Sequence, residues 1–321
     1  MKRALMTLLL LVPVLAQPLP EALKRASEVA AVATARLDLA LKQKDLARTL
    51  QDPLRTALSE LQARQAALLA EAKLKRALAQ AESDIVAAYA QAREAALQVA
   101  LAAKALEVAE LGLKATEVRV KGGGATSLDL LEAQNRVLEA RKNLEAAQRG
   151  QESALAALAN LVGAWKPESV QELPPLPGME VVEALLQEHA DLLQLRQSLE
   201  LLRFQRGLLD ESFAARRDLE ALEDQARTLE ENLGSLERSL RVALEARHRQ
   251  LAPLLQGVKT AEEAYRGAQE RYRAEEKRFQ AGLASRLSLL QQELALKQAE
   301  LTLEQAKHAY LKAYYGLLAS R

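Results

Sequence analysis

Leucine and alanine recur every seven residues along much of this chain, and this spacing is the strongest constraint on its fold. In one stretch Leu130, Val137 and Leu144 stand seven apart, and Ala133 and Ala140 follow three places after the first two. A strict seven-residue repeat predicts helices that supercoil around one another in a left-handed sense. Alanine in the seam lets two helix backbones approach closely. The pattern therefore predicts long antiparallel coiled-coil hairpins.

Few residues interrupt the heptads, and those few locate the turns. Asp52-Pro53 can end one helix and start the next, with Asp52 as the N-cap and Pro53 at the first helical position. Gly122-Gly123-Gly124 and Ala281-Gly282 can reverse the chain. We predict six helices, over residues 21–51, 54–121, 127–162, 180–206, 211–280 and 286–319.

The two halves of the chain repeat each other at a shift of 159 residues. This shift superimposes Gly123 on Gly282 and Thr126 on Ser285, together with the helices on either side. Chance likeness between Ala/Leu-rich helices does not explain the matched glycine turns, so an internal duplication is the favoured interpretation. The predicted organisation is a first helical repeat over 17–162, a Pro-rich linker over 163–179 and a second helical repeat over 180–321.

The first sixteen residues have the features of an export signal. Lys2 and Arg3 give a positive start, residues 4–16 carry no charge, and small residues surround Ala16. The alternative is an uncleaved anchor, but the run is short against the roughly 20 residues that span a bilayer. We predict a signal peptide over residues 1–16 and export of the mature protein.

Composition and spacing argue against several classes of protein. The 44 basic and 43 acidic residues nearly cancel, whereas a nucleic-acid-binding protein needs a basic surplus. The chain has no cysteine, and His189, His248 and His308 are scattered, so no metal site is expected. No nucleophile–base pair or phosphate-binding loop is found, so we expect neither an enzyme nor a cofactor.

The two glycine turns have matching capping residues. Thr126 and Asp129 form a predicted capping box, in which each side chain accepts from the other residue's backbone amide. In the second turn Ser285 is the predicted cap, and Ser288 replaces the acid. Asp129 is thus favoured as a helix cap.

Both turns resemble the tip signature of the TolC-like outer membrane efflux proteins. The resemblance lies in the Arg278-Phe279 pair followed by Gly282-Leu283-Ala284-Ser285, and in the segment 128–134 of the first turn. It implies a homotrimer whose hairpins form a periplasmic tube, and tips that meet a periplasmic adaptor working with an inner-membrane pump. By position, the implied adaptor contacts are Gly123, Ala125, Thr126, Gly282, Leu283, Ala284 and Ser285, and Asp129 is implied in a charged ring at the periplasmic mouth.

One departure from the family pattern is expected. The family places a β-hairpin between the first and second helices of each half, and these hairpins close into an outer-membrane barrel. Neither Asp52-Pro53 nor the stretch 207–210 is flanked by alternating strand residues, and the segment 54–61 is helical and charged. We therefore expect an all-α protein of two tandem three-helix repeats, a TolC-like α-barrel protomer without the β-barrel.

Two functional hypotheses follow. The first is a passive duct component of a tripartite export or type I secretion system, located in the periplasm with outer-membrane association left open. The second is a non-conducting coiled-coil scaffold or spacer of the cell envelope. A tube needs a polar stripe along the inner side of each hairpin, whereas a closed bundle needs that stripe to be apolar.

Overall fold

The computed structural model describes residues 16–209 and 216–321. Apart from Ala16, the predicted signal peptide over 1–16 lies outside the described residues, and so does the predicted start of the fifth helix at residue 211. Within the described ranges, every helix lacks an apolar stretch sufficient to cross a lipid bilayer.

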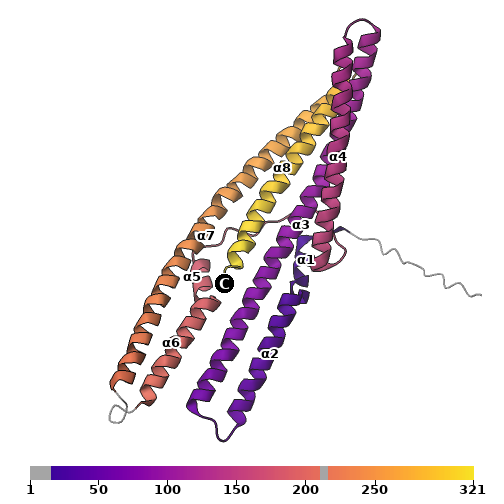
Figure 1. Cartoon of the computed structure of the whole chain (residues 1–321). Coiled ribbons are helices and arrows are strands. Elements are labelled where there is room, and N and C mark those ends of the chain that lie inside the picture. Colours follow the sequence, from indigo (N-terminus) through magenta and orange to yellow (C-terminus); the bar gives the residue numbers. More distant parts are fainter. Residues whose placement is uncertain (1–15, 210–215) are drawn as a thin grey trace, which may run out of the picture.

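Two helices of 65 residues, α3 and α7, extend from the base of the molecule to the two hairpin tips (Figure 1). Each would measure about 100 Å at about 1.5 Å per residue. At the tip end α4 packs on α3 and α8 packs on α7. At the base end α2 packs on α3 and α6 packs on α7. The helices are α1 (Leu19–Lys24), α2 (Ala30–Gln51), α3 (Ala57–Lys121), α4 (Ser127–Val162), α5 (Glu180–Glu188), α6 (Ala190–Leu208), α7 (Arg216–Gln280) and α8 (Arg286–Leu318).

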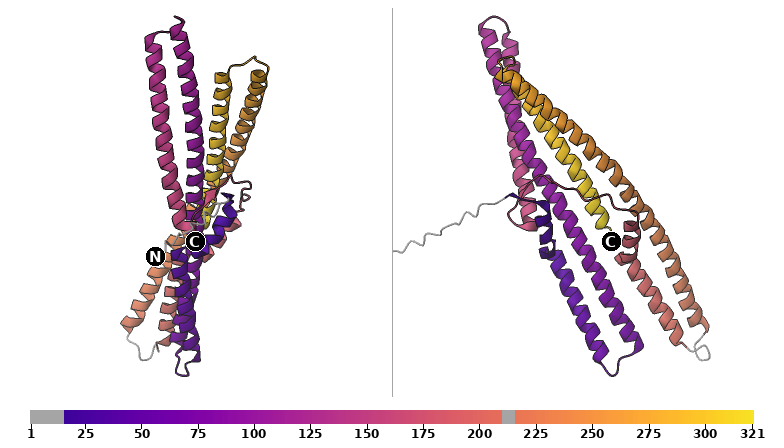
Figure 2. Two further views of the ribbon diagram at one scale, coloured as in Figure 1. Left: turned by 90° about the vertical axis from the view of Figure 1, so that its right-hand side faces the viewer. Right: turned by 180° about the vertical axis from the view of Figure 1, so that it is seen from behind.

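The protomer has two unlike edges. Helices α6 and α8 each contact both α3 and α7, so they lie between the two long helices. Helices α2 and α4 pack on α3 from the other side, which places them at one edge, while α7 forms the opposite edge (Figure 1). We call α3–α4 the first hairpin and α7–α8 the second hairpin. The tip of the first hairpin projects beyond that of the second (Figure 2).

The predicted fold class is confirmed, with one small addition. The described elements are helices, apart from a single parallel pairing of β1 (Ala16–Gln17) with β2 (Lys166–Pro167). This pairing ties the start of the described chain to the segment that follows α4.

The predicted helices over 21–51 and 180–206 are each broken, which corrects the sequence analysis. A 3₁₀ helix over Arg25–Glu28 and an extended Val29 separate α1 from α2. An extended His189 separates α5 from α6. The short helices α1 and α5 turn aside because each buries an apolar face against a long helix, α1 on α3 and α5 on α7. The buried residues are Leu19 and Ala22 in α1, and Val182, Leu185 and Leu186 in α5.

The predicted cap at Asp52-Pro53 is also wrong. Asp52 ends α2, and its Oδ1 accepts a hydrogen bond of 2.8 Å from the backbone amide of Leu54. Helix α3 begins instead after Thr56, which forms a capping box with Ser59. The Thr56–Ser59 box provides acceptors for two backbone amides that the start of a helix leaves free. A helix that began at Asp52-Pro53 would not have this box.

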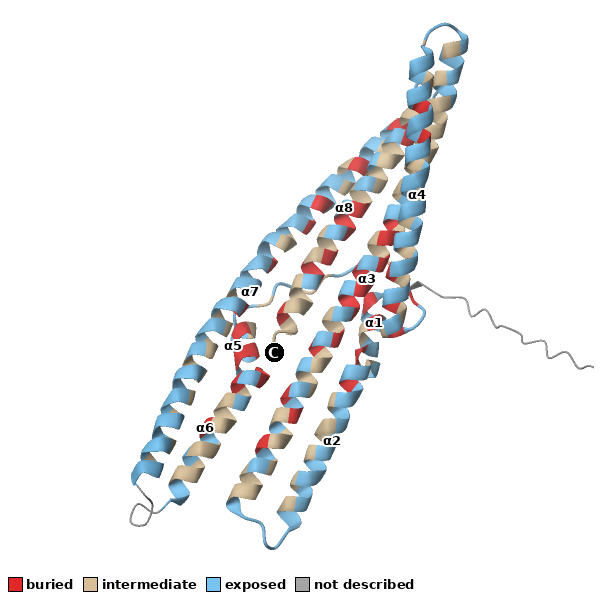
Figure 3. Ribbon diagram, viewed as in Figure 1, coloured by how far each residue is buried: buried red, intermediate tan, exposed pale blue. Residues whose placement is uncertain are grey.

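The heptad positions form the seams, as predicted. Leu251 of α7 and Tyr310 of α8 are fully buried, and so are Ile85 of α3 and Leu158 of α4. Burial is concentrated near the middle of the molecule (Figure 3). Towards the tip of the first hairpin, most of α4 is exposed or half-buried.

A buried polar cluster joins the two hairpins at mid-height. His308 of α8 is 1% exposed, and its Nδ1 lies 2.9 Å from Oε1 of Glu94 in α3. Glu304 is 2% exposed and accepts hydrogen bonds from Ser169 (2.6 Å) and Lys307 (3.3 Å). Buried polar groups are costly unless they are paired, so the His308–Glu94 contact disfavours any other alignment of α8 on α3.

Acid should weaken this junction. Burial alone would raise the pKa of Glu94, but the hydrogen bonds from His308 and Lys312 outweigh it and hold the pKa below its ordinary value of 4.5. A carboxyl group with a lowered pKa contributes stability above its unfolded pKa and loses it as the pH falls through the folded pKa. We expect the melting temperature to drop below about pH 4.5, and to drop less steeply in Glu94→Gln. Circular dichroism melts between pH 7 and 3 measure this. The exposed Glu132→Gln serves as control, and an unchanged profile in Glu94→Gln would contradict the assignment.

Candidate functional site: the two hairpin tips

The first tip is a tight glycine reversal followed by a capped helix. At the end of α3 the amides of Gly123 and Gly124 donate to the carbonyls of Val120 (3.0 Å) and Arg119 (2.8 Å). Gly123 has a φ of +75°, a conformation that side chains with a Cβ rarely adopt. These bonds satisfy carbonyls that the end of a helix leaves free.

The predicted capping box of the first tip is confirmed. Thr126 Oγ1 accepts from the Asp129 amide (3.2 Å), and Asp129 Oδ2 accepts from the Thr126 amide (2.7 Å). These hydrogen bonds, first from the Thr126 backbone and then from its hydroxyl, hold the pKa of Asp129 below its ordinary value. Asp129 is therefore a structural cap that also leaves a negative charge at the surface of the tip.

The second tip repeats this construction with fewer polar contacts. The amides of Gly282 and Leu283 donate to Phe279 (2.9 Å) and Arg278 (2.8 Å), and Gly282 has a φ of +71°. Ser285 caps α8 by accepting from the Ser288 amide at 3.0 Å. The Ser288 hydroxyl donates to Glu275 of α7, which is 8% exposed.

Ion pairs fix the second tip against the first hairpin. Lys104 of α3 lies 2.6 Å from Glu107 and 3.0 Å from Glu293 of α8, and Arg286 lies 3.5 Å from Glu107. Burial would lower the pKa of Lys104, but its hydrogen bonds to the two glutamates raise it above the ordinary value. The second tip therefore rests beside residue 107, about 20 Å short of the end of α3 at about 1.5 Å per residue.

The predicted contact residues lie within these two tips, at two different levels. Gly123, Thr126, Gly282, Leu283 and Ser285 are exposed, whereas Ala125 and Ala284 are half-buried. Leu283 is 72% exposed and Leu128 is 62% exposed. Each tip thus presents a leucine to solvent.

A groove lies beside the second tip that the sequence analysis did not identify. It has a volume of about 360 Å³ and is bounded by α3, α4 and the start of α8. The α3 side of the groove includes the small residues Ala105, Ala109 and Gly112, and Arg119 and Arg136 border it. The small residues were visible as part of the alanine seam, but the position of α8 beside them was not.

The described part of the chain holds no group of three or more His, Asp or Glu side chains placed to bind a metal ion. The chemistry of the tips is that of helix caps, ion pairs and exposed leucines, which suits contact with another protein.

This architecture is similar to that of several solved structures. No family model matches the sequence, and no curated protein sequence matches it. Solved structures do match. CusC superposes with a TM-score of 0.66 at 15% identity, over 96% of this chain and 92% of CusC. VceC of Vibrio cholerae gives 0.63 at 16% identity, over 94% and 96%. The CmeC outer membrane channel of Campylobacter jejuni gives 0.64 at 11% identity, over 94% and 85%.

The chain has a TolC-like fold. The structural likeness covers nearly the whole chain, including both hairpins, so it supports the resemblance that the tip residues indicated. The two glycine turns form the ends of the two hairpins in this fold.

Replacing the tip glycine should destabilise the second hairpin. Gly282→Ala places a Cβ at a φ of +71°, at an expected cost of about 1–2 kcal/mol. Nothing lies within 4 Å of that Cβ, so the cost is conformational rather than steric. The matched control is Gly112→Ala, inside α3 with equally open space, which should gain up to about 1 kcal/mol. Urea denaturation followed by circular dichroism compares them, and equal midpoints in both variants would contradict the turn assignment.

Proposed function

We propose that this chain is the duct component of an export system. In this proposal it is an exported, non-enzymatic protein of the cell envelope, and three copies close into a periplasmic tube associated with the outer membrane. The tips dock a periplasmic adaptor that works with an inner-membrane pump, as in tripartite exporters or type I secretion. The observation that carries the proposal is the match of nearly the whole chain to solved structures of outer membrane channels.

The unlike edges of the protomer support ring closure. An edge formed by α2 and α4 can meet an edge formed by α7 on the next copy, and such head-to-tail contacts form rings when the rotation closes. Helix α4 carries an outer apolar stripe of Leu131 and Leu138, which are 52% and 62% exposed. Leu37 and Leu41 continue this edge on α2 with 67% and 60% exposure. A neighbouring copy would cover these side chains.

The tips and the groove beside them support adaptor docking. The exposed leucines Leu128 and Leu283 offer apolar contacts, and the small residues of the groove would let another helix approach closely. The capping bonds hold both tips in a fixed shape, so little conformational freedom would be lost on binding. The adaptor contacts and the pore-mouth role of Asp129 remain part of this proposal.

The ion pairs between α3 and α8 suit a conduit that opens by helix displacement. Lys104 and Arg286 lie near the tip end, and the cluster around His308 lies at mid-height. Half-exposed pairs such as Arg286–Glu107 contribute little stability and are easily exchanged for water. The buried cluster is costly to open. Displacement of the second tip would therefore pivot about the middle of α8.

The trimer can be tested at the α4 stripe. Sedimentation equilibrium of the wild-type protein should give the mass of three chains, and Leu131→Glu with Leu138→Glu should lower the oligomeric state because charges would replace apolar side chains in the contact. The matched control is Leu283→Glu, an equally exposed leucine outside the proposed contact. A wild-type monomer at micromolar concentration would contradict the ring.

Adaptor docking can be tested with single cysteines, since the natural chain contains none. Cysteine at Gly282 or Ala125, labelled with a photoactivatable cross-linker in cells, should capture an adaptor protein. The control is cysteine at Leu54, which is 86% exposed in the turn at the base end. Capture from the tips alone supports the duct. Trimers that form normally but capture no adaptor would instead favour the scaffold hypothesis.

A further inference from the structure

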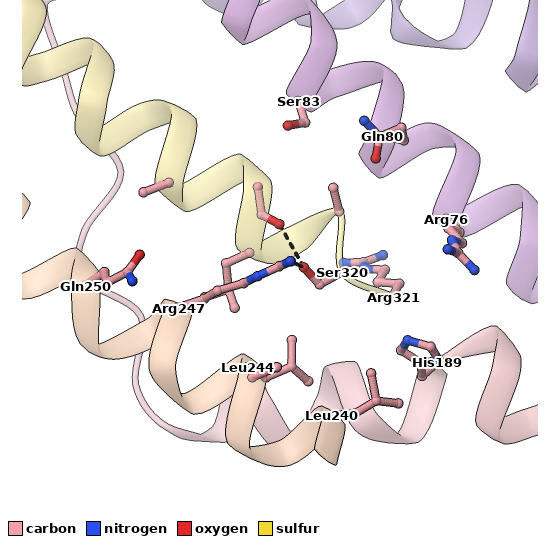
Figure 4. Close-up of a pocket in the computed structure, with 15 residues that line it drawn as sticks. Arg76, Gln80, Ser83, His189, Leu240, Leu244, Arg247, Gln250, Ser320 and Arg321 are labelled. Carbon is pink, nitrogen blue, oxygen red and sulfur yellow. Dashed lines mark hydrogen bonds between the residues drawn. The ribbon is translucent and has the colours of Figure 1, made fainter. Parts of the chain in front are cut away.

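A cavity of about 620 Å³ opens at the level where α8 ends and α6 begins, between the two long helices (Figure 4). Its walls come from α3, α7, the residues after α8 and the junction between α5 and α6. This volume falls in the range typical of small-molecule sites.

Three arginines from three different segments border this cavity: Arg76 of α3, Arg247 of α7 and Arg321 after α8. The other polar residues around it are Gln80, Ser83, His189, Gln250 and Ser320. None of these lining residues is acidic. The cavity is therefore rich in hydrogen-bond donors and carries positive charge on three sides.

The existing partners leave much of this charge available. Arg247 donates to the Ser320 hydroxyl, and no carboxylate of the described residues lies within 4.0 Å of its guanidinium. Arg76 pairs with Asp191 at 3.5 Å, Arg321 pairs with Glu188 at 3.7 Å, and the charge of Arg321 also acts on Glu82. Asp191 and Glu188 are partly exposed, and ion pairs of this length at the surface contribute little. They are therefore weak competitors for a bound anion.

A further side chain in the cavity favours an acceptor. His189 Nδ1 accepts from the Asp191 amide at 3.3 Å, so a neutral ring carries its proton on Nε2 as a donor. Burial lowers the pKa of His189, Asp191 opposes this, and Arg76 adds to it.

The other junction of the fold shows that such a cavity is not required. Where α4 ends and α1 begins, Trp165 is 9% exposed and packs in the apolar core with Leu19 and Ala22. The guanidinium of Arg25 lies over the Trp165 ring, 5.8 Å from its centroid. At this junction an apolar core therefore takes the place that the arginine-lined space has where α8 ends.

We propose that this cavity binds a small oxyanion carrying at least two negative charges, of the phosphate or polycarboxylate class. Guanidinium groups bind such oxygens through paired hydrogen bonds, and three of them from separate segments of the chain would hold one anion from several sides. Bound there, the anion would tie α3, α7 and the end of α8 together. This inference stands apart from the proposed duct function, because it requires neither a ring nor an adaptor.

The experiment is a titration of the purified wild-type protein with pyrophosphate and, separately, with citrate, at pH 7 and constant ionic strength maintained with sodium chloride. Calorimetry should show saturable binding of at least one of the two anions, and the melting temperature should rise with its concentration. The anion that binds identifies the class. Absence of binding by both overturns the proposal, as does an equal rise in melting temperature with chloride alone.

Matched variants locate the binding. Arg247→Gln should weaken the affinity about tenfold or more, as expected for loss of a charge-assisted contact, while circular dichroism confirms an unchanged fold. Arg249→Gln is the control, because Arg249 lies two residues away, is 72% exposed and pairs with Glu245 outside the cavity. If Arg247→Gln does not fold, Arg76→Gln replaces it. Equal affinities in the cavity variant and the control would overturn the assignment.

Discussion

A hairpin of two helices can bury only the residues along its seam, and this limit shapes the whole molecule. Leu251 and Tyr310 are fully enclosed, but most residues one turn to either side of a seam keep contact with water. Stability must therefore come from stacking hairpins side by side, as α8 does on α3. The same limit leaves leucines exposed along α4, where none of the described helices covers them.

The polar contacts between the two hairpins determine the register of α8 along α3, which the apolar seams alone would not fix. Leucine and alanine repeats are similar at every heptad, so α8 could slide along α3 by seven residues with modest change in apolar burial. Such a shift would separate His308 from Glu94 and Glu304 from Ser169, which is a large penalty for buried polar groups. A few buried charges thus specify one register, and through it the level at which the second tip rests.

Much of the fold could be predicted from the sequence because it rests on local rules. The heptads identified the seam positions, and the Thr126–Asp129 pair identified a cap that the structure contains. The breaks at Val29 and His189 could not be predicted, since neither residue is a helix breaker and the break arises from burial of α1 and α5 on distant helices. The same holds for the ion pairs at Lys104 and for the arginine-lined cavity, which depend on contacts between residues far apart in the chain. The adaptor-contact residues remain a prediction.

The unequal reach of the two hairpins has a geometric consequence. In any closed ring of identical copies, long and short hairpin tips would alternate around one end, because each copy contributes one hairpin of each height. A partner with a flat surface could contact only the tips of the first hairpins. A partner that contacts both kinds of tip would need projections that reach down to the second hairpins, so the end of the ring favours a partner of complementary, uneven shape.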